Sequence, residues 1–358
     1  MIVYAFIAFF LSFASSFVII YLVRRKFHLL ITDHLHEGPQ KFHTRPTPRL
    51  GGIGLYLALL IALVLALLKG ESYKYDFALL FISATPAFMA GLWEDLSGKL
   101  SPKLRFLLIW LSGTLAFFLG GAKLVRLDLP IDFLFNSLLF SYFFTVFALT
   151  GLTNAINIID GFNGLASMVS IIILLALGYV SYKVGDYFLA TLCIAYIGAL
   201  AGFFILNYPH GLIFLGDGGA YLTGFLLGSI SVLLVKRHSE VSPWFPFLVC
   251  IYPIFETLFS IYRRKFLKGT SPFLPDGLHL HTLIYKRLTK WLLGPEAEKI
   301  KRNAATSPFL WVLSLLGVAP ALLFWNSTPI LILFSLFFVF VYLYLYWRIL
   351  IPRWVFKK

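Results

Sequence analysis

The sequence predicts an all-α membrane protein, a bundle of about eleven transmembrane helices formed by a single domain over residues 1–358. Three observations support this prediction. Of the 358 residues, 59% are hydrophobic and 13% are charged, whereas a soluble domain is about half apolar and about a quarter charged. The 38 Phe and 18 Tyr residues exceed what one soluble core of this size can bury. Long apolar runs also recur along the chain, separated by short charged segments.

Each apolar run is long enough to cross the hydrocarbon core as a helix, which takes about 20 residues. The first run has no basic residue before it, and Arg24, Arg25 and Lys26 follow it. This order is the reverse of that in a cleaved signal peptide and indicates a retained helix. The expected spans are 2–23, 50–68, 76–93, 104–121, 134–152, 164–182, 187–206, 219–235, 244–262, 307–325 and 328–349.

The distribution of basic residues predicts the orientation, because Lys and Arg accumulate in cytoplasmic loops. With the N-terminus outside and the C-terminus in the cytoplasm, 23 of the 30 Lys and Arg residues fall on the inner side. This bias accounts for the net charge of +14 without nucleic acid as a partner. Cys193 and Cys250 both lie within apolar runs, so no disulfide framework is expected.

Carboxylates are scarce, and several stand at the cytoplasmic ends of the expected spans. Glu94 and Asp95 close the third span in GLWEDLSGKLSPK, and Lys103 ends that segment. Adjacent carboxylates can bind a divalent cation, and a lysine can hold phosphate. The alternative is a solvated loop of the ordinary positive-inside kind.

A second polar cluster lies in TNAINIIDGFNGLA, with Asn154, Asn157, Asp160 and Asn163 at steps of three. Neighbours three apart share one face of a helix, so these side chains would form a line of amide and carboxylate oxygens. Asparagines that merely cap helix ends are the alternative. Four polar residues in an otherwise apolar segment favour a binding face.

A third carboxylate, Asp217, stands between glycines in FLGDGGAY at the start of a span. This position suits Mg²⁺ that carries a diphosphate, because Mg²⁺ takes one or two protein carboxylates and leaves its other positions to water and phosphate. A simple Gly-Asp-Gly turn is the alternative.

Two basic or histidine-containing segments complete the pattern. In KFHTRPTPRLGG, a proline-stiffened approach to the second span carries basic side chains that could receive an anionic lipid headgroup, or that serve only the positive-inside bias. In PDGLHLHTLIYKR, two histidines favour phosphate or uracil contacts or a local structural role over zinc, which would want more ligands. The residues concerned are Lys41, His43 and Arg49 in the first segment and Asp276, His279 and His281 in the second.

In this order on a many-span chain, the five segments resemble the polyprenyl-phosphate N-acetylhexosamine-1-phosphate transferases, a family that includes phospho-N-acetylmuramoyl-pentapeptide transferase. The resemblance covers about residues 40–285 and leaves the spans at 307–349 outside. It implies transfer of a sugar 1-phosphate from a UDP-N-acetylhexosamine, such as UDP-GlcNAc, to undecaprenyl phosphate, with release of UMP. It also implies Mg²⁺, with Mn²⁺ as a substitute, and contact with inner-leaflet lipid. A bacterial inner membrane, a cytoplasmic active site and a homodimer are further expectations.

The resemblance assigns roles residue by residue. It places Asn157 and Asp217 at the metal, and it makes Asp95, Asp160 and Lys103 catalytic. The family's paired aspartates read Glu94-Asp95 here, and the second acid of its DGxDG pattern is Asn163, which as an amide can be neither nucleophile nor base. The expected substrate-binding residues are Glu94, Asn154, Asn163, Lys41, His43, Arg49, Asp276, His279 and His281.

Two questions about mechanism and class stay open at this level. A lipid phosphate is already an anionic nucleophile, so we favour its direct attack, with Asp95 or Asp160 as the base. A covalent aspartyl intermediate is the alternative, and a phosphorylated aspartate trapped during turnover would establish it. A secondary transporter is the rival class, but it should show midplane carboxylates in repeated halves. Here Glu256 alone lies clearly within an expected span, and no repeat is visible.

Overall fold

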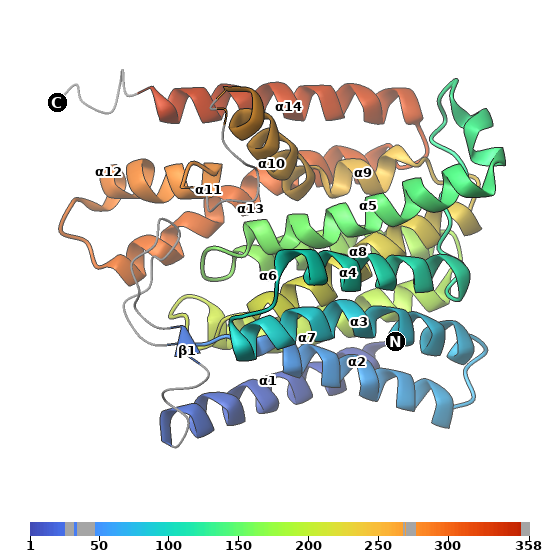
Figure 1. Cartoon of the computed structure of the whole chain (residues 1–358), viewed down its shortest axis with the longest axis horizontal. Coiled ribbons are helices and arrows are strands. Elements are labelled where there is room, and N and C mark those ends of the chain that lie inside the picture. The colour runs from blue at the N-terminus through green and yellow to red at the C-terminus, as the bar shows by residue number, and fades with distance from the viewer. Residues whose placement is uncertain (26–31, 34–46, 268, 270–276, 352–358) are drawn as a thin grey trace.

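The computed structural model describes residues 1–25, 32–33, 47–267, 269 and 277–351, and most of these residues form helices that run side by side in one bundle (Figure 1). Within the described part of the chain, strands are limited to β1 (Thr32–Asp33) and β2 (Thr47–Pro48). The two strands pair antiparallel, with Thr32 opposite Pro48. The predicted all-α fold class is confirmed.

Nine helices among the described residues are long and apolar enough to cross a membrane, which makes this a multi-pass membrane protein. Their positions match nine of the expected spans to within a few residues at most ends. They are α1 (Ile2–Arg25), α2 (Gly51–Leu68), α3 (Lys74–Ser97), α5 (Leu138–Ile159), α6 (Leu165–Lys183), α7 (Tyr187–Asn207), α8 (Gly216–Arg237), α13 (Lys299–Leu323) and α14 (Thr328–Leu350).

The other two expected spans are shorter or interrupted. The span expected at 104–121 is α4 (Pro102–Phe118), which has 17 residues. The span expected at 244–262 is divided into α9 (Trp244–Val249) and α10 (Ile251–Tyr262), and α10 turns away from the line of α9 (Figure 1). Pro253 contributes to this break because it has no N–H to close a helical hydrogen bond. The total of eleven spans therefore stays a prediction.

Short helical segments connect or extend the long helices. They include a 3₁₀ turn before α5 and two π-helical turns, one before and one after His279 and His281 in the chain. These elements are η1 (Asp132–Asn136), η2 (Arg263–Leu267), α11 (Leu280–Leu283), η3 (Ile284–Thr289) and α12 (Lys290–Leu293).

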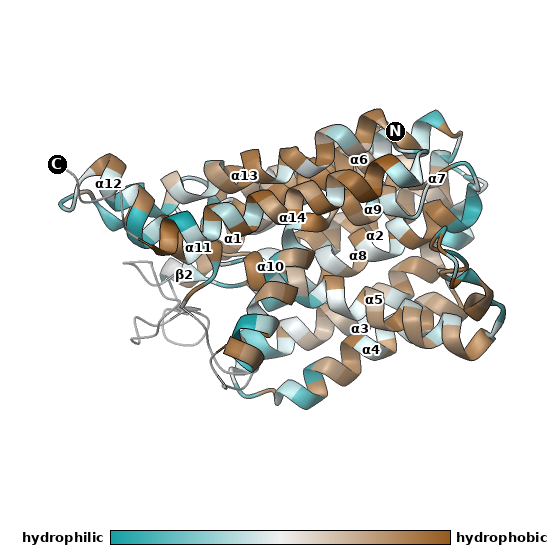
Figure 2. Ribbon diagram, turned by 90° about the horizontal axis from the view of Figure 1, so that it is seen from above, coloured by the Kyte–Doolittle hydropathy of each residue, from teal (hydrophilic) through white to brown (hydrophobic). Residues whose placement is uncertain are grey.

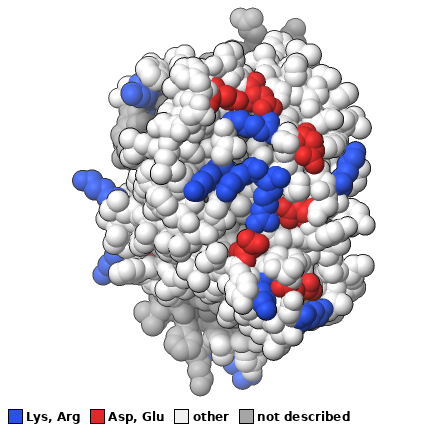
Figure 3. All heavy atoms as spheres, turned by 90° about the vertical axis from the view of Figure 1, so that its right-hand side faces the viewer, with Lys and Arg blue, Asp and Glu red and all other residues white. Residues whose placement is uncertain are grey.

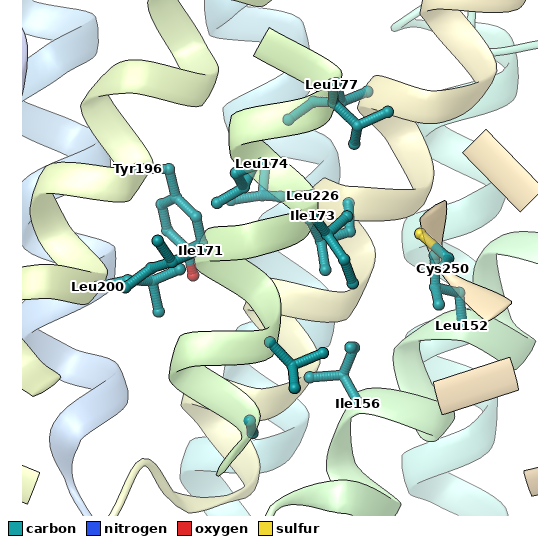
Figure 4. Packing of buried hydrophobic residues seen from close by; sticks show 14 of the residues in the cluster. Leu152, Ile156, Ile171, Ile173, Leu174, Leu177, Tyr196, Leu200, Leu226 and Cys250 are labelled. Atoms are coloured by element: carbon teal, nitrogen blue, oxygen red, sulfur yellow. The ribbon is translucent and has the colours of Figure 1, made fainter. Parts of the chain in front are cut away.

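The core is built around α8, in which every residue from Gly216 to Val235 is buried. A helix that is apolar on all sides needs neighbours on all sides. Figure 4 shows part of this core, where Ile156 of α5, Tyr196 of α7 and Leu226 of α8 fill the space between helices. Peripheral helices such as α1 and α14 instead expose apolar side chains, as a lipid-facing surface requires. The ribbon of α14 is largely brown, which marks hydrophobic residues (Figure 2).

The two ends of the bundle differ in what they carry. One end, shown in Figure 3, has Lys and Arg interleaved with Asp and Glu. Arg237 at the end of α8 pairs there with Asp76 of α3 at 3.1 Å and with Asp186 at 3.6 Å. These pairs tie α8, α3 and the start of α7 together at the end predicted to lie outside. The polar clusters of the sequence gather at the other end.

The orientation can be tested by labelling single cysteines in a chain whose buried Cys193 and Cys250 are replaced by alanine. In right-side-out vesicles, we expect a membrane-impermeant maleimide to label Glu240→Cys at once. Lys301→Cys should react only after the membrane is permeabilised, since positive-inside bias puts that loop in the cytoplasm. Both side chains are exposed, at 52% and 70%. The reverse labelling pattern would contradict the predicted orientation.

Candidate active site

Three helix ends and the loop before α2 bring several of the predicted site residues together. Asp95 lies in the last turn of α3, Asn157 in the last turn of α5 and Asp217 in the first turn of α8. The Asn157 amide donates to Oδ1 of Asp217 at 3.0 Å. The structure therefore places in one group residues that the sequence separates by more than 120 positions.

Asp95 caps the N-terminus of α8 from the neighbouring helix. Its carboxylate accepts hydrogen bonds from the backbone N–H of Asp217 at 3.0 Å and of Gly218 at 2.9 Å. The first N–H groups of a helix have no partner within it, and a negative charge there is favourable. Gly216 permits this approach, because a Cβ on it would lie 2.5 Å from Oδ2 of Asp95 and its φ of +75° disfavours other residues.

Arg49 joins the two aspartates. Its guanidinium lies 3.6 Å from Asp95 and 3.2 Å from Asp217. Backbone pairing fixes the arginine in this place, since the N–H of Phe214 donates to the carbonyl of Pro48 at 2.8 Å, and the N–H of Gly51 donates back to Phe214 at 3.0 Å. The loop that precedes α2 is thus docked on the loop that precedes α8.

A second arginine, which the sequence reasoning missed, completes the group. Arg105 of α4 donates to Oδ2 of Asp217 at 3.0 Å and lies 3.7 Å from Glu94. Lys103, the predicted catalytic lysine, is exposed on the first turn of α4. Side chains two residues apart on a helix project to different sides. The structure therefore brings Arg105 rather than Lys103 to the carboxylates. An arginine at the edge of an apolar run was the available signal.

Glu94 and Asn154 occupy supporting positions. Oε2 of Glu94 accepts the N–H of Leu100 at 2.9 Å and so closes the turn between α3 and α4. The Asn154 amide donates to the carbonyl of Thr150 one turn earlier, at 2.8 Å. Asn154 and Asn157 share a face of α5, as expected from their spacing. That face ends at Ile159, where the helix ends.

Asp160 stands immediately after α5, at the edge of the group. Burial raises its pKa from 3.8 to about 7, while the charge of Arg49 lowers that pKa and the charge of Asp217 raises it. The group therefore titrates near neutral pH, the range in which a carboxylate can accept and release a proton during a reaction.

Asn163, a predicted substrate contact, is engaged within the protein. Its side chain is buried and donates to the carbonyl of Pro209 at 2.9 Å. Helix α13 holds the backbone of the same loop. Asn303 accepts the N–H of Asn163 at 2.9 Å, and Ser307 donates to its carbonyl at 2.6 Å. Trp311 donates to Gly164 at 3.1 Å, so three side chains spaced by four residues support the turn after Asp160.

The two histidines reach the same loop from the opposite direction. Their rings stack with centroids 5.0 Å apart. A Cβ built on Gly161 would lie 3.5 Å from Nε2 of His281, so this imidazole stands directly beside the residue that follows Asp160. Phosphate or uracil contacts by His279 and His281 stay a prediction. Lys41, His43 and Asp276 lie outside the described residues.

The residue types around Asp217 are those that a hard divalent cation prefers, although Arg49 and Arg105 donate to both carboxylate oxygens of Asp217 here. Asp217 and Asn157 offer carboxylate and amide oxygens, and the carboxyl groups of Asp95 and Asp160 lie nearby. Among the described residues, no three His, Cys, Asp or Glu side chains form a metal cluster of their own. Mg²⁺ does not need one, because it keeps water and takes phosphate oxygens in most of its positions.

Comparison with known proteins bears on the chemistry of this site. Residues 77–235 match the family model described as glycosyl transferase family 4. A phospho-N-acetylmuramoyl-pentapeptide-transferase of Streptococcus pneumoniae serotype 2 is 30% identical over 250 residues, which cover 67% of this chain and 74% of the relative. The chain belongs to glycosyl transferase family 4. The family predicted from the motifs is confirmed, and the protein is a membrane-embedded transferase.

Two further relatives are similar at lower identity. A decaprenyl-phosphate N-acetylglucosaminephosphotransferase of Mycolicibacterium smegmatis is 27% identical over 270 residues, 67% of this chain and 65% of the relative. A probable undecaprenyl-phosphate N-acetylglucosaminyl 1-phosphate transferase of Bacillus subtilis is 25% identical over 244 residues, 68% of this chain and 66% of the relative. The family match includes Asp95, Arg105, Asn157, Asp160 and Asp217.

The cap on α8 predicts the effect of shortening Asp95. We expect Asp95→Ala to lower the free energy of unfolding by about 1 to 2 kcal/mol, the usual cost of losing an N-cap. Asp95→Asn keeps an acceptor oxygen and should lose less. The measurement is the apparent Tm in detergent, followed with a thiol-reactive dye that detects the buried Cys193 and Cys250 on unfolding. Equal losses for Asp95→Ala and for Glu240→Ala, an exposed control, would contradict the capping role.

The raised pKa of Asp160 predicts a pH-dependent effect on stability. The folded chain holds this proton more tightly than the unfolded chain, so ionisation between about pH 4 and pH 7 destabilises the fold. Asp160→Asn removes that cost. The measured quantity is the apparent Tm of the variant minus that of wild type, followed by tryptophan fluorescence in EDTA. We expect this difference to be about 1 to 3 °C larger at pH 8 than at pH 5. A difference that does not change with pH would argue against the raised pKa.

Proposed function

We propose that this member of glycosyl transferase family 4 transfers an N-acetylhexosamine 1-phosphate from a UDP-sugar to undecaprenyl phosphate or a related polyprenyl phosphate, with release of UMP. The observation that carries the proposal is the carboxylate of Asp217, which lies between Asn157, Arg49 and Arg105 at the end of the bundle where the motifs meet. This reaction fits the names of two relatives, which refer to polyprenyl phosphates and N-acetylglucosamine.

The main physical difficulty of such a reaction is to bring two phosphate anions together, and positive charge at the site reduces their repulsion. Arg49 and Arg105 place two permanent positive charges beside Asp217. Fixed charges of this kind stabilise the negative charge that develops on a transferring phosphoryl group. Asp217 and Asn157 would hold Mg²⁺, which when bound neutralises charge on the diphosphate of the donor.

In the proposed step, an oxygen of the lipid phosphate forms a bond to the phosphorus that carries the sugar. The bond from that phosphorus to the UMP oxygen breaks, and UMP leaves with the electron pair. Asp160 accepts the remaining proton of the lipid phosphate, for which its pKa of about 7 is suited. Asp95 is less suited to act as base or nucleophile, because its two oxygens already accept the N–H groups of α8.

We place this site on the cytoplasmic side of a bacterial inner membrane, where Lys and Arg concentrate. The lipid headgroup would enter from the inner leaflet toward Arg49 and Asp160. UDP-N-acetylglucosamine is the first donor to test, and a homodimer stays an expectation from the family.

The transporter alternative has little support in the structure. A transporter would carry coupling carboxylates near the bilayer midplane in broken helices, often in repeated halves. Glu256 does lie in the broken pair α9 and α10, but it is fully buried and enclosed by hydrogen-bond donors. Its position instead points to a supporting role for the histidine segment.

The proposed reaction is tested by UMP release from purified protein given undecaprenyl phosphate, Mg²⁺ and a panel of UDP-N-acetylhexosamines. We expect release that requires both lipid and metal. Asp217→Asn should reduce kcat/KM at least about 100-fold, since it removes the charge expected at the metal, equivalent to about 2.7 kcal/mol or more in the transition state.

Glu298→Gln is the matched control, because it removes one exposed carboxylate at the same end of the bundle and should leave the rate unchanged. No release with any donor, from protein shown to be folded, would overturn the assignment. Flux measured in proteoliposomes would then decide whether the transporter alternative gains support.

A further inference from the structure

Glu256 is a fully buried carboxylate with three hydrogen-bond donors around it. Its Oε1 lies 2.9 Å from Nδ1 of His279 and accepts the N–H of Leu280 at 3.2 Å. Its Oε2 accepts the hydroxyl of Tyr342, on α14, at 2.8 Å. A buried ionised carboxylate is retained only with good partners, and it accepts rather than donates. Nδ1 of His279 therefore carries the ring hydrogen, which it donates to Glu256.

A second set of bonds fixes the backbone just before His279. Arg263 donates to the carbonyl of Leu278 at 2.6 Å and to the hydroxyl of Tyr346 at 2.8 Å. That hydroxyl donates in turn to the carbonyl of Leu278 at 3.2 Å. Tyr342 and Tyr346 are four residues apart and so share one face of α14. The last helix thus holds Leu278 directly through Tyr346 and His279 indirectly, through the bond of Tyr342 to Glu256.

The histidine segment connects this network to the reacting groups. The ring of His279 stacks on that of His281, with 11° between their planes. His281 packs edge-on against Phe162, with centroids 5.6 Å apart, and its Nε2 stands beside Gly161. Gly161 and Phe162 follow Asp160 directly in the chain. A shift of the stacked rings would therefore displace the loop that carries Asp160.

We propose that Glu256 and Tyr342 are positioning residues, which hold the His279–His281 pair against the Asp160 loop in register with the phosphates of the nucleotide-sugar donor. The choice of donor phosphates as the ligand rests on the proposed function above. By this inference, α14 is part of the catalytic apparatus although it lies outside the segment that matches the family. Loss of one hydrogen bond in the network leaves a buried charge partly unsatisfied and frees the rings to move.

Steady-state kinetics of UMP release test the proposal with Tyr342→Phe and Glu256→Gln. We expect each to raise the KM for the UDP-sugar about tenfold, with a KM for undecaprenyl phosphate within twofold of wild type. Tyr196→Phe is the matched control, because it also deletes one buried hydroxyl, bonded to Thr223 at 2.9 Å, in a part of the bundle away from the histidines. Tyr342→Phe carries the test if Glu256→Gln does not fold. Unchanged donor KM in a folded Tyr342→Phe protein would overturn the proposal.

A spectroscopic measurement separates this inference from the proposed function. In protein labelled with ¹⁵N-histidine, a His279→Gln variant assigns the signals of His279. We expect Tyr342→Phe and Glu256→Gln to shift these signals, whereas Tyr196→Phe leaves them in place. If wild-type protein releases no UMP, the proposed function fails, but the shift still decides the positioning role. Signals that are unchanged in Tyr342→Phe would overturn that role.

Discussion

The contact between the carboxylate of Asp95 and the first N–H groups of α8 is the interaction on which the site depends. α8 lies at the centre of the bundle, so its N-terminal N–H groups cannot all be satisfied by water. A carboxylate from α3 supplies the missing acceptor, and its charge matches the positive end of the helix dipole. Close approach of the two helices makes this possible, since a Cβ on Gly91 would lie 2.3 Å from the backbone of Asp217. The same contact places Asp217 between the two arginines.

The C-terminal helices extend the site beyond the segment that matches the family. α13 holds the turn after Asp160 through Asn303, Ser307 and Trp311, all on one face. α14 bonds the carbonyl of Leu278 through Tyr346, and its Tyr342 bonds Glu256, the partner of His279. Both helices thus bind loops that approach Asp160 from different sides. Through these polar side chains, α13 and α14 support the loops of the site, although neither helix carries a motif of its own.

Much of the fold follows from apolar run length alone, and the differences have local causes. The fifth span was expected to end at residue 152, but α5 continues to Ile159. Its asparagines can remain helical because Asn154 bonds to Thr150 and Asn157 faces Asp217 rather than lipid. The eighth span was expected from residue 219, but α8 begins at Gly216, where Asp95 caps it. In both cases a residue of another helix, Asp217 or Asp95, bonds to the additional helical turn.

The sequence by itself determined that the chain is a membrane bundle and which family it belongs to, and it predicted which residues form the site. These properties depend on composition and on the order of motifs, which are local in the chain. The tertiary structure decided which side chains meet. It brought Arg105 rather than Lys103 to Asp217, turned Asn163 into the protein and joined Glu256 to His279. Such partners lie many residues apart, and only the packing of helices fixes the distance and direction between them.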